Sequence, residues 1–375
     1  MLVIKLLLNR IFIMLLISPI VLAHADEQAI ILVSSNALTG PAAELGIKLT
    51  QGAEVYFNKI NHQGGILGRQ IKLSTFDDGY EPFRTVENTY KALASERPLA
   101  LFNYAGTPNA HAILPIIAEH KIPFLMPFTG AEFLRTPVNP YVFNLRASYN
   151  QEAAAQIEYL VTKVKAKNIA LLVQADKFGA AVEKDYLLAM KKYQLKPVVT
   201  TRFRRNTQDI ELALAVMVEN GVDAIAFVGT YKPFIELINQ AYQQNFSPFF
   251  TTVSFISSDD LFAGIKVPAK ILVTEVLPDP TNCRLAVCQE FLNDIQPYKD
   301  VMPEHVVFEG YLNAKLFVEV AKRCKSGLTR ACLLKELAEF EGELGGMQLK
   351  FTASQHQGLN NIYFSLFDNK MLSTQ

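Results

Sequence analysis

The stretch from Ala37 to Asp78 constrains the fold of this chain more than any other. An apolar run at 30–35 leads into a Gly–Pro turn, and a long segment follows with apolar residues along one helical face. Gly64 and Gly65 then end the predicted helix, because glycine adopts the left-handed cap conformation without steric cost. A second apolar run at 71–76 completes a β–α–β unit, which predicts a right-handed connection and a parallel sheet.

The ends of these two strands indicate where a ligand would bind. In open parallel sheets, ligands lie beyond the carboxyl ends of the strands, so we expect 38–45 and 77–79 to face a crevice. Asp77 and Asp78 could form a carboxylate pair for metal or acid–base chemistry. Their position at a strand end, before a glycine, is more typical of a turn with side-chain to backbone hydrogen bonds.

The first residues have the pattern of a secretory signal peptide. Lys5 and Arg10 precede an apolar run at 11–22, and a small-x-small motif ends at Ala25. An uncleaved membrane anchor is the alternative, but the run is shorter than the ~20 residues that a spanning helix needs. We therefore expect a signal peptide at 1–25 and cleavage after Ala25. The product would be free in the periplasm or secreted, since no cysteine precedes Cys283 to carry a lipid anchor.

The charge and length of the chain narrow its partners. Lys and Arg together number 36, as do Asp and Glu, so the formal net charge is zero. This balance argues against nucleic acid or an anionic membrane as the main partner. No second apolar run is long enough to span a membrane. The remaining length predicts two domains, each with its own core.

The four cysteines permit three disulfide pairings. Pairing of Cys283 with Cys288 and of Cys324 with Cys332 is favoured, because each pair closes a short loop beside a predicted helix. Disulfides also fit an oxidising compartment. A zinc site is the alternative use of four thiols, but these spacings lack the close ligand doublets of structural zinc sites. We therefore expect no metal.

Apolar runs and helical patterns alternate along most of the chain. Further strands are expected at 99–104, 122–127, 141–145, 169–173, 198–203, 224–228, 249–252 and 271–277. Helices are expected at 82–95, 110–120, 150–164, 179–192, 208–220 and 232–244. This order predicts two doubly wound α/β units. Ser148 and Gln151 predict a capping box at the start of the third of these helices.

The C-terminal part carries too few elements for a third α/β domain. Helices are expected at 284–295, 304–325 and 331–340, and strands at 347–351 and 362–367. We expect these strands to complete the two earlier sheets, so that the chain crosses between the domains more than once.

The sequence contains no familiar catalytic motif. It has no GxSxG, HExxH or P-loop pattern, and its six histidines lack metal-ligand spacing. The motif GlyGlyIleLeuGly at 64–68 is similar to a dinucleotide loop. It follows a helix and precedes a strand, however, which is the reverse of the order that cradles phosphate. We therefore expect neither an enzyme nor a bound cofactor.

Several motifs together resemble one known family. LeuThrGlyPro at 38–41, AsnLysIleAsnHisGlnGlyGlyIleLeuGlyArg at 58–69 and the later AspAsp resemble the N-terminal signature of the periplasmic leucine/isoleucine/valine-binding proteins. These are the substrate-binding components of ABC importers of the branched-chain amino acid type. The likeness covers nearly the whole mature chain and continues through 122–127, 176–179, 229–241 and 345–351.

The resemblance implies an α/β fold of two doubly wound parallel-sheet lobes joined by a three-segment hinge, the type I periplasmic binding protein fold. Lobe 1 would hold residues 26–146 and 278–354, and lobe 2 would hold 147–277 and 355–375. The ligand would be enclosed between the lobes when the hinge closes.

The resemblance also implies ligand-binding positions at the strand ends of both lobes. They are Leu45, Thr107, Phe128, Thr129, Gly130, Phe178, Tyr231 and Ser254. Thr107 stands where a serine hydroxyl binds the ligand carboxylate, and Phe128 would offer main-chain groups. Gly130 falls where a threonine is common, a role that the neighbouring Thr129 could take.

Ser254 departs from the family pattern, in which an acidic residue pairs with the ligand ammonium. Enclosing an ammonium without a carboxylate is costly, so an ordinary α-amino acid loses its main anchor unless Glu44, Asp176 or Asp259 supplies the charge. We therefore favour a ligand that is not a standard branched-chain amino acid. A slip of the alignment by a residue or two near 250–260 is the alternative.

Arg146 and Tyr149 lie at the first predicted crossover between the lobes. Arg146 is interpreted as one partner of a hinge salt bridge rather than as a bidentate partner for a ligand carboxylate. Tyr149 either reaches the ligand or packs at the start of the following helix, and the sequence leaves both interpretations open.

These observations predict a periplasmic solute-binding protein. It would capture a small polar or aromatic ligand, such as an amino acid, an amide or an organic acid, and present it as a monomer to an inner-membrane ABC permease. The alternative is a periplasmic ligand-sensing module that acts on a separate signalling partner. A hydrolase with Asp77 as base is disfavoured, because no nucleophile or metal set accompanies that residue.

Overall fold

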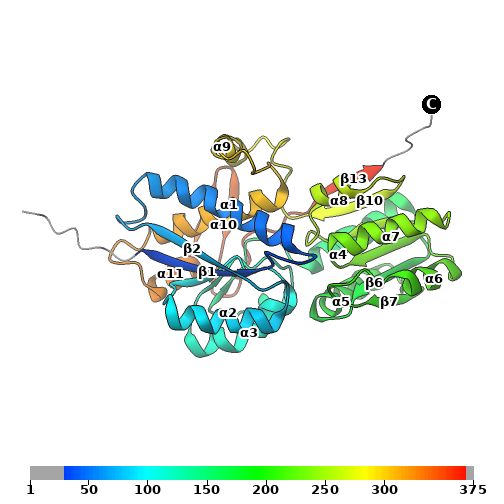
Figure 1. Ribbon diagram of the computed structural model, residues 1–375, viewed down its shortest axis with the longest axis horizontal. Coiled ribbons are helices and arrows are strands. Elements are labelled where there is room, and N and C mark those ends of the chain that lie inside the picture. The colour runs from blue at the N-terminus through cyan, green and yellow to red at the C-terminus, as the bar shows by residue number, and fades with distance from the viewer. Residues whose placement is uncertain (1–28, 369–375) are drawn as a thin grey trace, which may run out of the picture.

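The computed structural model describes residues 29–368, so the predicted signal peptide at 1–25 lies outside the described residues. Two sheets lie side by side along the long axis of the molecule, and each is covered by helices on both faces (Figure 1). The structure therefore has the predicted two α/β lobes.

The first lobe is built on a five-stranded sheet with the strand order β2-β1-β3-β4-β5. All neighbouring strands are parallel. The strands are β1 (Ile30–Asn36), β2 (Ile71–Asp77), β3 (Ala100–Phe102), β4 (Phe124–Leu125) and β5 (Val142–Phe143). The helices are α1 (Ala43–His62), α2 (Pro82–Ser95), α3 (Thr107–His120), the 3₁₀ turn η1 (Glu132–Leu134), α9 (Ala286–Ile295), α10 (His305–Ala321) and α11 (Arg330–Ala338).

Alternating strand residues face two separate helical layers in this lobe. Ile30 and Leu32 share a core with α1, α9, α10 and α11, whereas Val33 and Leu101 share a core with α2 and α3. Successive strand side chains point to opposite faces, so both faces of the sheet are buried. This explains the continuous apolar runs in the sequence.

Two glycines allow α1 and α10 to pack closely. A β-carbon at Gly52 would lie 1.9 Å from the carbonyl oxygen of Val307, and one at Gly310 would lie 2.1 Å from that of Leu49. A side chain at either position would force the helices apart. The close contact fixes the late helix α10 to the first lobe, although the whole second sheet except its last strand separates α1 and α10 in the sequence.

The second lobe is built on a six-stranded sheet with the order β13-β10-β9-β8-β6-β7. Only β13 runs antiparallel to its neighbour within this sheet. The strands are β6 (Ile169–Gln174), β7 (Thr200–Phe203), β8 (Ala224–Val228), β9 (Phe249–Thr252), β10 (Lys270–Glu275) and β13 (Tyr363–Asp368). The helices are α4 (Tyr149–Tyr159), its π-helical extension η2 (Leu160–Val164), α5 (Lys177–Lys192), α6 (Glu211–Glu219), α7 (Tyr231–Gln243) and α8 (Ser258–Gly264).

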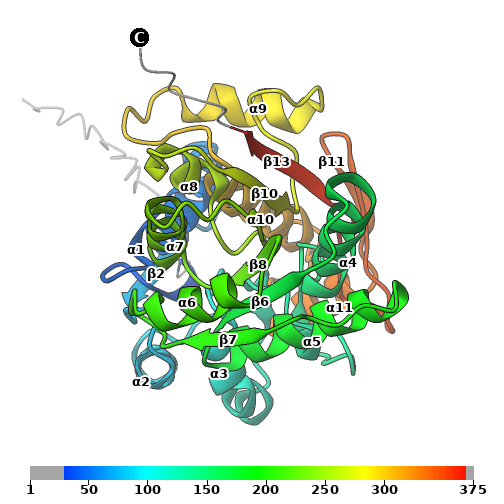
Figure 2. The same cartoon turned by 90° about the vertical axis from the view of Figure 1, so that its right-hand side faces the viewer.

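The second sheet also lies between two helical layers (Figure 2). Leu171 and Ala226 share a core with α4 and α5, whereas Leu172 and Phe227 share a core with α6 and α7. Helix α4 begins with the predicted capping box: the Ser148 hydroxyl accepts a hydrogen bond from the Gln151 amide, and the Gln151 side chain accepts one from the Ser148 amide. This prediction is confirmed.

Three segments connect the lobes, at 144–148, 276–285 and 351–362, each joining elements of one lobe to elements of the other. This is the predicted three-segment hinge. The residue boundaries 26–146 with 278–354 and 147–277 with 355–375 stay a prediction.

Arg135 connects the first and third of these segments. Its buried guanidinium donates hydrogen bonds to the carbonyl oxygens of Ala131 and Arg146, both at 3.0 Å, and to the side-chain oxygen of Gln357 at 2.6 Å. Burial lowers the pKa of Arg135 to about 10, so the group stays charged at neutral pH. A single side chain therefore fixes two hinge segments to the loop after β4.

One strand prediction was wrong. Residues 347–351 were expected to complete one of the two sheets, but β12 (Met347–Lys350) pairs with β11 (Glu341–Leu344) in a separate antiparallel hairpin. Gly345 and Gly346 both have positive φ and form the turn between these strands. The other late strand was predicted correctly, since β13 extends the second sheet along β10.

The four cysteines form the two favoured local pairs. The sulfur atoms of Cys283 and Cys288 are 2.00 Å apart, and those of Cys324 and Cys332 are 1.99 Å apart. Within residues 29–368, no group of three or more His, Cys, Asp and Glu side chains is arranged to hold a metal ion. No helix in that same range is both long and apolar enough to cross a membrane.

Candidate ligand-binding cleft

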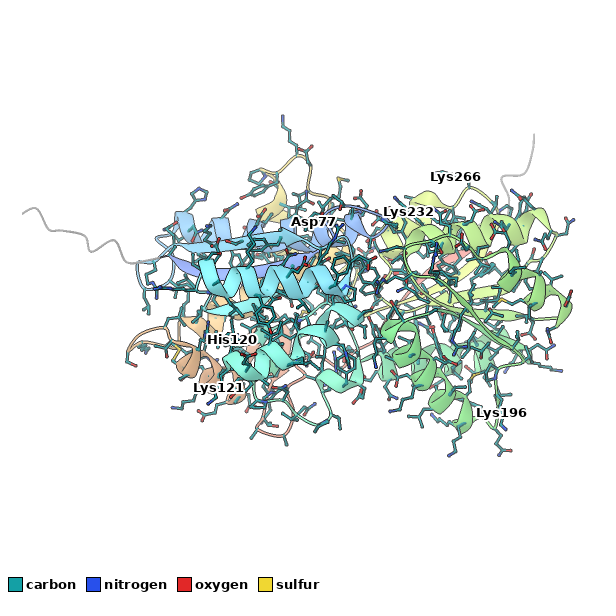
Figure 3. All side chains as sticks on the ribbon, turned by 60° about the horizontal axis from the view of Figure 1, so that its bottom comes forward. Asp77, His120, Lys121, Lys196, Lys232 and Lys266 are labelled. Carbon is teal, nitrogen blue, oxygen red and sulfur yellow. A yellow bond between two sulfur atoms is a disulfide. The ribbon has the colours of Figure 1, made fainter. Side chains whose placement is uncertain are left out.

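The carboxyl ends of the two sheets face each other where the lobes meet. Asp77, at the end of β2, lies near this junction, whereas His120 and Lys121 lie at the far end of α3 (Figure 3). The Asp77 carboxylate accepts hydrogen bonds from the backbone amides of Leu38, Thr39 and Gly79. The turn interpretation of the aspartates is therefore correct for Asp77, and these bonds lower its pKa although burial opposes them.

An aromatic cluster fills the cleft between the lobes. Phe255, in the segment after β9, has its ring centroid 5.7 Å from that of Tyr80, 5.9 Å from Phe128 and 4.7 Å from Phe178. Tyr149 lies 5.5 Å from Phe178 on the same side. All five rings are buried, so first-lobe and second-lobe side chains form one apolar surface.

Sequence reasoning missed Phe255 and Tyr80. Both follow the carboxyl end of a strand, β9 and β2 respectively, by three residues. That position was the available signal, because the same argument placed 77–79 at the crevice.

Arg146 lies against this cluster and is 1% exposed. Its guanidinium carbon is 4.1 Å from the centroid of the Phe128 ring, a cation–π contact. One terminal nitrogen, Nη2, donates hydrogen bonds to the carbonyl and the hydroxyl oxygens of Ser254. Nε lies 3.5 Å from the Glu309 carboxylate, and neither Nε nor Nη1 has a hydrogen-bond partner among the described residues.

Arg146 thus has an ion-pair partner, as predicted, but that partner lies in α10 of the first lobe and not in the hinge. Two of its donor nitrogens nevertheless remain available, so the alternative interpretation of Arg146 as a ligand contact gains support.

Ser254 is fully engaged with a buried carboxylate. Its amide and hydroxyl donate to Glu152 at 2.7 and 2.8 Å, and Thr274 donates to the same carboxylate at 2.7 Å. Burial raises the pKa of Glu152, and the nearby Arg146 charge opposes that shift. The acidic group near the Ser254 position is therefore Glu152, which lies behind the serine and already has three donors.

The threonines predicted to bind a ligand form a pair on the first lobe. The Thr107 and Thr129 hydroxyl oxygens are 2.7 Å apart. Tyr149 donates its amide hydrogen to the Gly130 carbonyl at 2.8 Å, and a β-carbon on Gly130 would lie 2.6 Å from the Tyr149 ring. Gly130 therefore makes room for Tyr149, whose hydroxyl is buried and has no hydrogen-bond partner within the described chain.

Leu45 and Tyr231 lie on the other side of Phe255. Together with Ala42, Phe255 and neighbouring residues, they line a cavity of about 10 Å³ between the lobes. This volume corresponds to roughly one water molecule. The lobes are therefore closed on each other, with aromatic side chains filling most of the cleft.

The structure brings all the predicted positions into this region. Thr107, Phe128, Thr129, Gly130, Tyr149, Phe178 and Ser254 lie around Arg146 and the aromatic cluster, and Leu45 and Tyr231 face the small cavity. Their role in ligand binding stays a prediction.

Two of the three suggested substitutes for a carboxylate at Ser254 are occupied. Asp176 accepts hydrogen bonds from the Phe178 and Gly179 amides and from Gln174, and it caps α5. Asp259 accepts hydrogen bonds from the His305 amide and ring, both at 3.1 Å. Glu44 has an exposed side chain in the first turn of α1.

Ion pairs join the lobes at the rims of the cleft. Lys48 of α1 lies 2.5 Å from Asp260 of α8 and 2.5 Å from Glu304. On another side, Arg205 of the second lobe pairs with Glu81 of the first. The Lys48–Asp260 and Arg205–Glu81 contacts form only when the lobes approach each other.

The fold and the cleft define this chain as a two-lobed α/β solute-binding protein. A family model described as periplasmic binding protein matches residues 34–370. The chain belongs to this family, which is a family of periplasmic substrate-binding proteins.

Known proteins resemble the chain to different extents. The crystal structure of a possible leucine/isoleucine/valine-binding protein from Rhodopirellula baltica is 31% identical, with a TM-score of 0.86 over 92% of this chain and 95% of that one. A substrate-binding periplasmic protein from Ralstonia solanacearum is 27% identical, with a TM-score of 0.82 over 89% and 96% of the two chains. An amino acid binding protein of Pseudomonas aeruginosa is 22% identical over 60% of each chain. The chain thus matches about 60% of the length of this curated relative.

Proposed function

We propose that this protein is the solute receptor of an ABC-type importer, capturing a small polar or aromatic ligand between its lobes. The observation that supports this most is the cleft itself. Strand ends of both lobes converge on it. Arg146 and Tyr149 also have buried donors there without an acceptor among the described residues, and a ligand would supply that acceptor. Such a site, apolar with a few convergent polar groups, is the typical form of a small-molecule site.

Ligand binding would act by stabilising the closed form. The Lys48–Asp260 and Arg205–Glu81 pairs bridge the lobes and hold them together. A ligand that contacts both lobes has higher affinity for the closed state and shifts the population toward it. The permease would then recognise the closed arrangement of the two lobe surfaces.

The nine predicted positions form the proposed binding site. They are Leu45, Thr107, Phe128, Thr129, Gly130, Tyr149, Phe178, Tyr231 and Ser254, and we add Arg146, Tyr80 and Phe255 from the geometry. The protein would act as a monomer. It would also act without turnover, because the pKa of Asp77 is lowered and a weakly basic carboxylate is a poor general base.

Export would be accompanied by cleavage after Ala25, which mass spectrometry of the periplasmic protein would test. An intact mass that includes residues 1–25 would contradict this step.

A thermal-shift screen tests the receptor function. The purified protein is heated with amino acids, aliphatic and aromatic acids, amides and urea-like solutes. A true ligand at ~100 times its Kd adds ~2.7 kcal/mol to the free energy of unfolding. Each hit is then recovered and analysed after incubation. Chemical conversion of a hit would contradict the receptor function, as would the absence of any stabilising solute.

A further inference from the structure

We propose that the ligand is a carboxylic acid with an apolar or aromatic body and no α-ammonium group, and that Arg146 and Tyr149 bind its carboxylate. This inference rests on the proposed receptor function and specifies the class of substrate.

The unpaired donors carry the argument for a carboxylate. Arg146 is 1% exposed and Tyr149 is fully buried, yet Nε and Nη1 of the one and the hydroxyl of the other have no partner in the described part of the chain. A buried donor without an acceptor is costly and needs an explanation. Nε and Nη1 lie on different edges of the guanidinium, each beside Nη2, so a ligand carboxylate can accept from one of them together with Nη2 as a bidentate pair.

Arg146 and Tyr149 also lie close enough to affect each other. Burial raises the pKa of the Tyr149 hydroxyl, and the Arg146 charge opposes this shift. The hydroxyl lies beside Thr129, whose own hydroxyl contacts Thr107. One small anionic group could therefore receive donors from an arginine, a tyrosine and a threonine.

Most of the carboxylates nearby already have partners, which argues against an ammonium. Glu152 accepts three hydrogen bonds, Asp259 binds His305, and Glu309 is the counter-ion of Arg146. Glu275 keeps one oxygen without a hydrogen-bond partner in the described chain, but burial, opposed by the His305 charge, raises the pKa of Glu275 to about 7, so it is a weak counter-ion at neutral pH. An enclosed ammonium would have to take Glu152, Asp259 or Glu309 from its present partner, at a substantial cost, or pair with the partly protonated Glu275.

The rest of the cleft suits an apolar body. From Arg146 the surface continues through the rings of Phe128 and Phe255 to the cavity beside Leu45 and Tyr231. The cavity of about 10 Å³ cannot hold a ligand body, so the Phe255 ring moves or the lobes separate when the ligand enters.

Matched compounds test this inference on the unmodified protein. Isothermal titration would compare 3-phenylpropanoate with L-phenylalanine and with 3-phenylpropanamide, and 4-methylpentanoate with L-leucine. The acids should bind at least ~10-fold more tightly than the amino acids and the amide, because one charged hydrogen bond is commonly worth that factor. Equal or tighter binding of the amino acids would overturn the inference and leave the receptor function standing.

Two variants test the assigned residues. Tyr149→Phe removes a hydroxyl without a partner, so the stability of the ligand-free protein should stay the same or rise, while affinity for the acid falls by ~10-fold. Arg146→Lys keeps the positive charge but loses the planar guanidinium. It should lower the affinity for the acid by a larger factor than Tyr149→Phe does. Tyr90→Phe, at a 46% exposed ring on α2, is the matched control and should change neither property.

The outcomes separate the two proposals. Unchanged acid affinity in Tyr149→Phe would overturn the assignment of that residue. Hits confined to neutral or amino-acid solutes in the broad screen would overturn the ligand class alone. If no solute in that screen binds, both the ligand class and the receptor function are rejected.

Discussion

His305 gives a pH-dependent contribution to stability that can be calculated from its contacts. It begins α10 in the first lobe, and its amide and ring nitrogen both lie 3.1 Å from the Asp259 carboxylate of the second lobe. Burial alone would lower the pKa of His305, but the carboxylates of Glu275 and Asp259 outweigh it and raise the pKa from 6.5 to about 9. Asp279 acts in the same direction.

The sign of the effect follows from this raised pKa. The folded protein holds the His305 proton more tightly than the unfolded chain, so the stabilisation is complete below pH 6.5 and is lost as the pH rises through 9. A shift from 6.5 to about 9, at ~1.4 kcal/mol per pH unit, corresponds to roughly 3 to 4 kcal/mol at most. The pKa of Glu275 is raised from 4.5 to about 7, so protonated Glu275 also stabilises the folded protein. This contribution is complete below pH 4.5 and is lost as the pH rises through 7.

Urea unfolding of the wild type and of His305→Gln at pH 7, 8, 9 and 10 would measure this contribution. The difference between the two free energies of unfolding should be largest at pH 7 and shrink by up to ~3 kcal/mol by pH 10. His111→Gln is the control, because the His111 side chain is exposed and its pKa is lowered instead. A constant difference between wild type and His305→Gln over this range would refute the reasoning.

Three further predictions concern packing, closure and cross-linking. Gly310→Ala should lower the free energy of unfolding by ~2 kcal/mol or more, because the new methyl group would lie 2.1 Å from a backbone oxygen of α1; an unchanged urea midpoint would contradict this. Arg205→Ala should shift the lobes toward the open form by removing the pair with Glu81, and X-ray scattering should show a larger radius of gyration, whereas an unaltered profile would argue against that pair as a latch. Replacing Cys324 and Cys332 together with alanine should cost ~2.5 kcal/mol from loop entropy over their separation of 8 residues; a double variant that melts like the wild type would reject this estimate.

The strands and their order along the chain could be predicted because both sheets are buried on both faces. Continuous apolar runs such as 169–173 and 224–228 stand out from the amphipathic helices between them. The strand ends then placed 38–45 and 77–79 at the cleft by topology, whereas Thr107 and Phe178 were assigned to it through the family resemblance.

The hairpin of β11 and β12 could not be predicted, because its first strand has no clear strand pattern in the sequence. Residues 341–344 read Glu-Gly-Glu-Leu, with two charges in four residues, and nothing in this run distinguishes a strand from a loop. Its partner at 347–350 alternates buried and exposed residues, which fits a half-exposed hairpin rather than a central strand.

Contacts between the lobes depend on closure and leave no local signal. Lys48 and Asp260 are 212 positions apart, and Arg146 and Ser254 are 108 apart. The sequence does not show which carboxylate Lys48 pairs with, because many carboxylates are equally suitable. Only the folded geometry brings Lys48 to Asp260. Arg146 was weighed as a ligand contact and interpreted as a hinge salt bridge. Its burial could not be predicted, because an arginine before a helix is usually exposed, whereas Arg146 is 1% exposed.

The guanidinium of Arg135 reduces the ways in which the two lobes can move. It donates hydrogen bonds to Arg146 of the first hinge segment and to Gln357 of the third. These two hinge segments therefore cannot slide past each other without losing hydrogen bonds from a buried cation. Opening should then be close to a pure rotation about an axis near this residue. One angle would then describe how far the lobes are open. Acids of different shape would therefore all produce the same final arrangement of the outer surfaces of the two lobes.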